Sequence, residues 1–199
     1  MENKINIIAL IAGISTLLLI AISVFVPWWR FTVGNPAIAQ VNFSPVNFNL
    51  ALFGSPITIP LIFAMNLACI LTLASGGIVL LIYSIRPNKP YSQRLLGFGY
   101  KKPLIAVMLF VIELIALTIL AGTVSGIAFP LMGSGTLQIP QQMIPGGGVS
   151  VIVNVIAAFE WPFYFAILVA GFCVATRLYH RKIPLTATEP SITKATITN

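Results

Sequence analysis

FVPWWRFTVGNPAIAQVNF, residues Phe25 to Phe43, is the stretch in which the character of the chain changes. An uncharged apolar run from Ile5 to Pro27 leads into it. Two tryptophans and an arginine follow, and then apolar and polar residues alternate around a Gly-Asn pair. Three interpretations are open: the stretch ends a signal peptide, closes a membrane helix, or begins a folded surface outside a membrane.

The composition favours a membrane protein. Of the 199 residues, 58% are hydrophobic and only 8% are charged, whereas a soluble domain carries about 25% charged residues. The mean hydropathy is +0.98. A chain so poor in charge could not keep a soluble surface hydrated, so a lipid bilayer is its natural solvent.

Four apolar stretches are long enough to cross a bilayer. A span needs about 20 apolar residues at a rise of about 1.5 Å each, and a backbone in lipid satisfies its own polar groups as a helix. We therefore predict an all-α membrane protein, a four-helix transmembrane bundle over residues 1–182, followed by a disordered cytoplasmic tail at 183–199. The predicted helices cover residues 5–27, 60–85, 103–129 and 149–176.

The basic residues predict the orientation of the bundle. Arg30 is the only one of the 11 Lys and Arg residues that falls in the predicted loops 28–59 and 130–148. It is also the only charged residue predicted on that side. Because basic residues concentrate on the cytoplasmic side of membrane proteins, we expect a multi-pass protein of the cell membrane with both termini inside and these two loops outside. The net charge of +7 is then a topology signal, and we expect no nucleic-acid binding.

A signal peptide remains the alternative for the first helix, because Ala37-Ile38-Ala39 fits a cleavage site. The apolar core of a signal peptide is about 7–15 residues long, which is shorter than the run from Ile5 to Pro27. Tryptophan at the end of an apolar run is typical of a membrane interface. We therefore predict a retained helix, with Trp28, Trp29 and Arg30 as its interfacial anchor.

The first loop has the pattern of short strands. FTV followed by Gly-Asn indicates a strand and a turn. VNF occurs twice, at Val41–Phe43 and Val46–Phe48, and Pro45 between the repeats indicates a bend or a sheet edge. We predict a small extracellular antiparallel sheet of two to four strands, to which TLQI at 136–139 could add one more. An irregular loop is the alternative.

The chain offers little chemistry for catalysis or metal binding. It has a single histidine, His180, no aspartate, and two cysteines, Cys69 and Cys173, that lie at different depths of the predicted bundle. We find no arrangement typical of a catalytic triad and no set of metal ligands. We therefore expect a non-enzymatic protein with no cofactor and no metal, in which both cysteines are unpaired packing residues.

Two carboxyls fall inside predicted helices, Glu113 in the third and Glu160 in the fourth. An ionisable group within a span is costly and marks a candidate functional site. Our first hypothesis is that each carboxyl forms hydrogen bonds that tie helices together, with Asn66, Tyr164 or the backbone as partners. Proton or cation conduction is the alternative.

Small residues at helical spacing predict close contacts between helices. They occur in the predicted second, third and fourth helices. The predicted helix-packing residues are Ala68, Thr72, Gly76, Gly122, Gly126 and Gly171.

One resemblance to a known family is visible. PWWRFTVGNPAIAQ, Pro27 to Gln40, resembles the end of the first helix and the first strand of claudin-like four-span membrane proteins. NLALFG, Asn49 to Gly54, loosely resembles that family's Gly-Leu-Trp segment. The cysteine pair of the family's first loop is absent here. The resemblance implies cytoplasmic termini and assembly, lateral or face to face, through the outer β element.

The leading functional hypothesis is a structural or scaffolding membrane protein that acts through helix packing and its extracellular loops. Its partners would be membrane lipids and further copies of itself. The second hypothesis is an accessory subunit of a respiratory or transport membrane complex, and the third is a proton- or ion-conducting oligomer.

Overall fold

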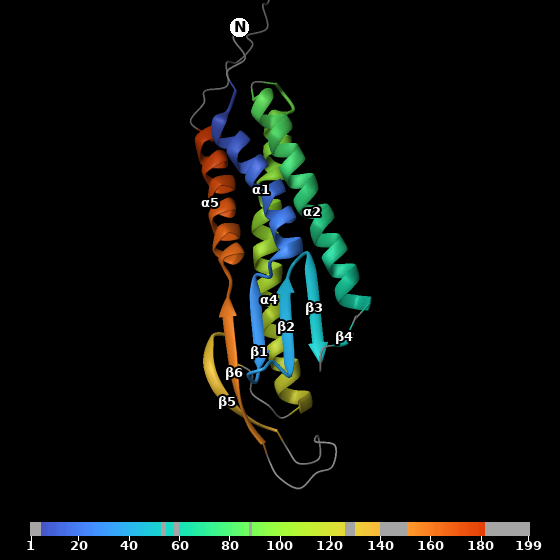
Figure 1. Cartoon of the computed structure of the whole chain (residues 1–199). Helices are drawn as coiled ribbons and strands as arrows, with labels where there is room; N and C mark the ends of the chain where they lie inside the picture. The colour runs from blue at the N-terminus through green and yellow to red at the C-terminus, as the bar shows by residue number, and fades with distance from the viewer. Residues whose placement is uncertain are drawn as a thin grey trace, which may run out of the picture.

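The computed structural model describes residues 5–52, 55–57, 60–87, 89–125, 130–139 and 151–181. Within these residues the chain is mainly helical, and four helices are long and apolar enough to cross a membrane, as the sequence predicts. They form a bundle with a β-sheet at one end (Figure 1). The long helices are α1 (Ile7–Phe25), α2 (Pro60–Ile85), α4 (Lys101–Ser125) and α5 (Trp161–Arg181).

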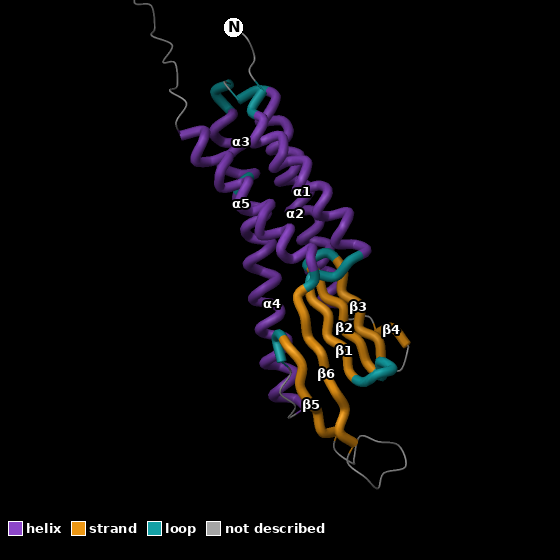
Figure 2. The backbone as a smooth tube through the Cα atoms, turned by 60° about the vertical axis from the view of Figure 1, so that its left-hand side comes forward, coloured by secondary structure: helices purple, strands orange, loops and turns teal. Residues whose placement is uncertain are grey.

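The connection between α2 and α4 lies at the end of the bundle opposite the sheet (Figure 2). It contains a short helix, α3 (Ser92–Gly99), which the sequence analysis did not predict. Ser92 begins this helix, and its hydroxyl donates a hydrogen bond of 2.6 Å to the carbonyl oxygen of Arg86 just after α2. The basic connection is therefore a folded cap on the bundle. The tail at 183–199 lies outside the described residues.

The sheet is larger than predicted. It is a single antiparallel sheet of six strands in the order β4-β3-β2-β1-β6-β5. Four strands come from the first loop, within the predicted range, and 136–139 belongs to a fifth strand, as expected. The strands are β1 (Trp29–Val33), β2 (Ala39–Ser44), β3 (Asn47–Leu52), β4 (Ser55–Ile57), β5 (Gly133–Ile139) and β6 (Val151–Phe159).

Strand β6 corrects the prediction of a fourth helix that begins at residue 149. Residues 155–159 pair with β1 and residues 151–157 pair with β5, and the helix starts only at Trp161. Two features explain the difference. The segment is rich in Val and Ile, which favour strands, and its burial alternates, with Val153, Val155 and Ala157 buried and their neighbours exposed.

The turns of the first loop follow the sequence signals. Gly34 adopts a positive φ of 80° in the turn that links β1 to β2, a conformation that glycine reaches without steric cost. The two VNF repeats lie on either side of the β2–β3 turn, and their phenylalanines, Phe43 and Phe48, pair with each other. Pro45 lies in the tight turn of that hairpin, so the predicted bend is confirmed.

The main hydrophobic core joins the sheet to the helices. Helix α4 continues past the sheet-side ends of the other helices and runs behind the sheet (Figure 1). Every second residue of β1 faces this helix: Trp29, Phe31 and Val33. These three side chains form one hydrophobic cluster with Phe110 and Leu114 of α4. The sheet is therefore fixed on the bundle by a continuous apolar core rather than held by its loops alone.

Helices α1 and α2 approach each other closely at two glycines. A Cβ atom added at Gly13 would lie 3.1 Å from the carbonyl oxygen of Gly77, and one added at Gly77 would lie 3.3 Å from that of Gly13. Both helices therefore depend on glycine at this crossing. The pair is not predicted from the sequence, because neither glycine belongs to the predicted set of helix-packing residues.

Candidate functional site

Trp28 and Trp29 are buried at the junction between α1 and the sheet, so they are not the predicted interfacial anchor. Trp28 is 0% exposed and Trp29 is 3% exposed. The indole of Trp28 donates a hydrogen bond of 2.7 Å to Ser23 Oγ, and its ring meets that of Phe110 edge-on at 5.0 Å. The indole of Trp29 donates to the carbonyl oxygen of Leu131 at 2.8 Å. Both indoles satisfy their N–H groups inside the protein.

The prediction placed Glu160 inside a helix. In the structure it lies at the junction between β6 and α5. Its carboxylate is 3.4 Å from the guanidinium of Arg30, in the neighbouring strand β1. The backbone N–H of Glu160 donates to the carbonyl oxygen of Trp28 at 2.9 Å. The carboxylate also stands at the start of α5, where a negative charge is favourable. The partner of the carboxyl is therefore Arg30, and not Asn66, Tyr164 or the backbone as predicted; the bond to Trp28 is made by the main chain of Glu160.

The pair changes the charge expected at this end of the molecule. Among the described residues of the sheet and of its junctions with the helices, Arg30 and Glu160 are the only charged side chains. The sequence predicted Arg30 as the sole charge on this side of the molecule, and Glu160 corrects that prediction. Tyr164 and Trp161, in the first turn of α5, are each 54% exposed. Unlike Trp28 and Trp29, they are exposed aromatic residues at this end of the bundle, as are Phe25 and Phe63.

The ion pair should contribute little to stability, because its side chains are 44% and 29% exposed. A double-mutant cycle with Arg30→Gln and Glu160→Gln should give a coupling energy of about 0.2–1 kcal/mol. The coupling should shrink in 1 M salt, where the Debye length is about 3 Å. Unfolding by SDS in mixed micelles, followed by circular dichroism, measures both values. A coupling that salt leaves unchanged would contradict a screened surface pair.

Glu113 lies in the middle of α4, apart from Glu160. Its side chain is half-buried and faces α2 near Cys69. Within the described part of the chain it has neither a hydrogen bond nor an ion pair, so the predicted hydrogen bond between helices is not present in the single chain. The two carboxyls do not share a site. The structure therefore provides no continuous row of titratable groups through the described helices.

The predicted packing residues separate into different environments. Gly76 is buried, and a Cβ atom there would lie 2.6 Å from Cβ of Lys102. Thr72 is half-buried, and Ala68 is exposed. Gly171 is exposed and has no atom within 4 Å of an added Cβ, so it does not pack within this chain. Gly122 is half-buried in α4, and Gly126 lies outside the described residues.

The described residues contain no group of three or more His, Cys, Asp or Glu that could hold a metal ion. Cys69 on α2 and Cys173 on α5 are both buried and unpaired, which confirms that prediction. No protein-family model matches the chain, and it matches no curated protein.

The exposed face of β6 carries apolar side chains that the sequence analysis did not single out. Ile152 is 67% exposed and Ile156 is 57% exposed, and they point to the same side of the sheet because strand residues two or four apart share a face. Met132, just before β5, is 68% exposed. Beyond β6 lies only β5, whose outer edge is unpaired within the described sheet. We call Met132, Ile152 and Ile156 the β5–β6 patch.

Proposed function

We propose that the chain is a non-enzymatic, multi-pass membrane protein with a structural or scaffolding role, and that copies of it assemble through the β5–β6 patch. The observation that carries this proposal is the exposure of Ile152 and Ile156 on the sheet. Exposed isoleucines on a membrane helix can be covered by lipid. The sheet stands at the end of the bundle (Figure 2), so its isoleucines need another protein surface to cover them. Clustered apolar side chains outside a bilayer are typical of protein contacts.

The orientation belongs to the same proposal. The described basic residues other than Arg30 lie at the end of the bundle that carries α3, in the α2–α4 connection, at the start of α4 and in the last turns of α5. The positive-inside rule makes that end cytoplasmic and the sheet extracellular. Trp161 and Tyr164 then lie at the outer interface, where exposed aromatic residues are enriched.

The sheet is suited to transmit a contact to the helices because it joins them without a flexible linker. Ser44, in β2, donates from its hydroxyl to the carbonyl oxygen of Ser23 in α1 at 3.0 Å. The amide of Asn47 donates to the carbonyl oxygen of Val24 at 2.8 Å. These bonds satisfy carbonyl groups in the last turn of α1, which would otherwise lack partners. The claudin-like sequence resemblance implies the same use of an outer sheet.

The test is the oligomeric state of the whole chain in a mild detergent. Ile156→Asp places a carboxylate in the β5–β6 patch and should convert the assembly to monomers, because a buried unpaired charge opposes association. Asn49→Asp adds the same charge to an exposed position on β3 and should leave the mass unchanged. Light scattering during size-exclusion chromatography measures the mass of the protein in each complex.

A wild-type chain that is monomeric in detergent and in native membranes would contradict the assembly. An oligomer that Ile156→Asp leaves intact would place the contact elsewhere. Unlike chains at fixed stoichiometry in the native preparation would favour the accessory subunit of a larger membrane complex. Mass spectrometry of the purified material distinguishes like chains from unlike ones.

A further inference from the structure

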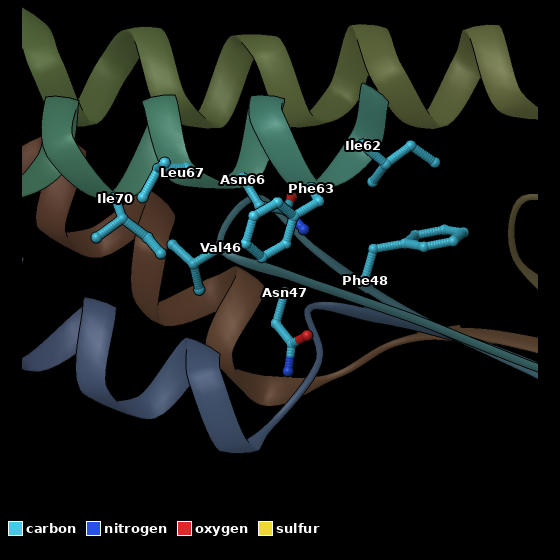
Figure 3. Close-up of a pocket in the computed structure, with 8 residues that line it drawn as sticks. All are labelled: Val46, Asn47, Phe48, Ile62, Phe63, Asn66, Leu67 and Ile70. Atoms are coloured by element: carbon cyan, nitrogen blue, oxygen red, sulfur yellow. The ribbon is translucent and has the colours of Figure 1, made fainter. Parts of the chain in front are cut away.

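A pocket lies between the sheet-side end of α2 and the β2–β3 hairpin (Figure 3). Its volume is about 130 Å³. An apolar cavity of about 150 Å³ is large enough to bind benzene, so this pocket has room for a short hydrocarbon segment. The residues that line it are Val46, Asn47, Phe48, Ile62, Phe63, Asn66, Leu67 and Ile70.

Asn66 is the unusual residue in this pocket. Its side chain is only 7% exposed, whereas Phe63 is 66% exposed and Leu67 is 49% exposed. In this part of α2 the polar residue is therefore buried and the apolar residues face outward. Lipid at the outer surface explains the exposed apolar side chains. It does not explain the buried amide.

The amide of Asn66 points into the pocket without a partner. It makes no hydrogen bond with the residues that the structure describes, although Asn47 across the pocket uses its own amide to bond Val24. No fully buried side-chain nitrogen or oxygen of the described residues lacks a hydrogen-bond partner, so the amide atoms of Asn66 are open to the pocket, where they can donate two hydrogen bonds and accept others. The pocket thus combines mostly apolar walls with a polar group, the Asn66 amide, that is free to bind a ligand, the pattern of a small-molecule binding site.

The position of Asn66 along α2 suggests which molecule fits. Helix α2 has 26 residues, about 39 Å at 1.5 Å per residue, against a hydrocarbon core of about 30 Å. Asn66 follows Pro60 by about 9 Å along the axis. In a centred helix it lies about 5 Å inside the hydrocarbon core. The bonds that join a lipid's headgroup to its chains lie close to this level.

We propose that the pocket binds one membrane lipid of the leaflet on the sheet side. The first methylenes of a lipid chain fill the space between Phe48, Phe63 and Ile70. The linkage oxygen of that chain accepts a hydrogen bond from Nδ2 of Asn66. This inference goes beyond assembly and rests only on the membrane placement of α2.

The experiment uses the full chain in phosphatidylcholine vesicles that contain a trace of photoreactive phosphatidylcholine. One probe carries its diazirine next to the chain carbonyl, and a second probe carries it at the chain end. After irradiation, mass spectrometry quantifies labelling at each residue. The first probe should label the pocket residues at least fivefold more than the second probe does. Leu71 is 63% exposed on the same helix, and its labelling reports membrane insertion independently of the pocket.

Three variants complete the test. Ile70→Trp fills the pocket and should cut its labelling at least fivefold. Leu71→Trp, the matched control outside the pocket, should leave it unchanged. Asn66→Leu should reduce it about threefold, the effect of one hydrogen bond of average strength in a membrane. Asn66→Leu also keeps the test decisive if Ile70→Trp does not fold.

Labelling of the exposed surface at Leu71 without enrichment in the pocket would overturn the lipid site while leaving the membrane placement intact. Pocket labelling that survives both Ile70→Trp and Asn66→Leu would overturn it as well. Neither result depends on the oligomeric state, so the assembly proposal is tested separately.

Discussion

Replacing Trp28 with alanine is expected to lower the free energy of unfolding by about 3–5 kcal/mol, the range for removing a large buried aromatic side chain. Trp28 is 0% exposed and stands where α1 ends and the sheet begins. Its ring contacts Phe110 of α4 and lies 6.3 Å from that of Phe163 of α5. The truncation would leave a cavity among three helices and would also remove the N–H donor to Ser23 Oγ, whose hydroxyl would still donate to the carbonyl oxygen of Leu19.

The control is Trp161→Ala, which removes the same side chain from a position that is 54% exposed. It should cost less than about 1 kcal/mol, because substitutions away from the core usually have small effects. Trp28→Phe should fall between the two, since it keeps most of the ring and loses the N–H donor. Unfolding by SDS in mixed micelles, followed by circular dichroism, avoids a signal that depends on tryptophan. Equal losses for Trp28→Ala and Trp161→Ala would show that Trp28 is not a core residue.

Gly76→Ala is expected to destabilise the protein by about 1–3 kcal/mol, the usual cost of overpacking. The new methyl group would lie 2.6 Å from Cβ of Lys102 and 3.3 Å from the carbonyl oxygen of Gly99. A Cβ atom cannot rotate away as the end of a long side chain can, so the α2 and α4 backbones must separate. Gly76→Leu should be worse, because the rest of its side chain must enter the same contact.

Gly171→Ala is the matched control, since it places the same methyl group in a helix at a position with nothing within 4 Å. Alanine is favoured over glycine in a helix by about 0.5–1 kcal/mol, so this variant should be neutral or slightly more stable in the same SDS titration. A Gly76→Ala protein as stable as Gly171→Ala would mean that the α2–α4 contact relaxes without cost.

The sequence was sufficient to predict the helices whose limits are marked by charge. Helices α1 and α2 are uncharged runs bounded by basic residues or by Pro and Trp, and the structure places them close to the predicted bounds. Strand β6 was misassigned because residues 149–159 are as apolar as a helix, and a short apolar run cannot be distinguished from a buried strand by hydropathy. Pro162, in the first turn of α5, is the local signal that marks the true start of the helix.

The surroundings of the candidate site residues could not be predicted, because they depend on contacts between distant segments that residue type does not reveal. A tryptophan after an apolar run is usual at a membrane interface, but Trp28 is buried because α4 and α5 place Phe110 and Phe163 against it. The partner of Glu160 was missed for the same reason: Arg30 comes from the other loop and is brought close by the pairing of β1 with β6. For Asn66, the sequence indicated a polar residue in a span but not the pocket it faces.

The central place of β1 has a consequence for the time course of folding. One edge of β1 pairs with β2, which follows it at once, but the other pairs with β6, from Phe159 opposite Trp29 onward. At about 5–20 residues per second of synthesis, the second partner emerges roughly 6–25 s after β1. During that interval the open edge of β1 can accept any strand that reaches it. The second loop therefore closes the sheet that the first loop begins, and the sheet is complete only after Phe159 has been made.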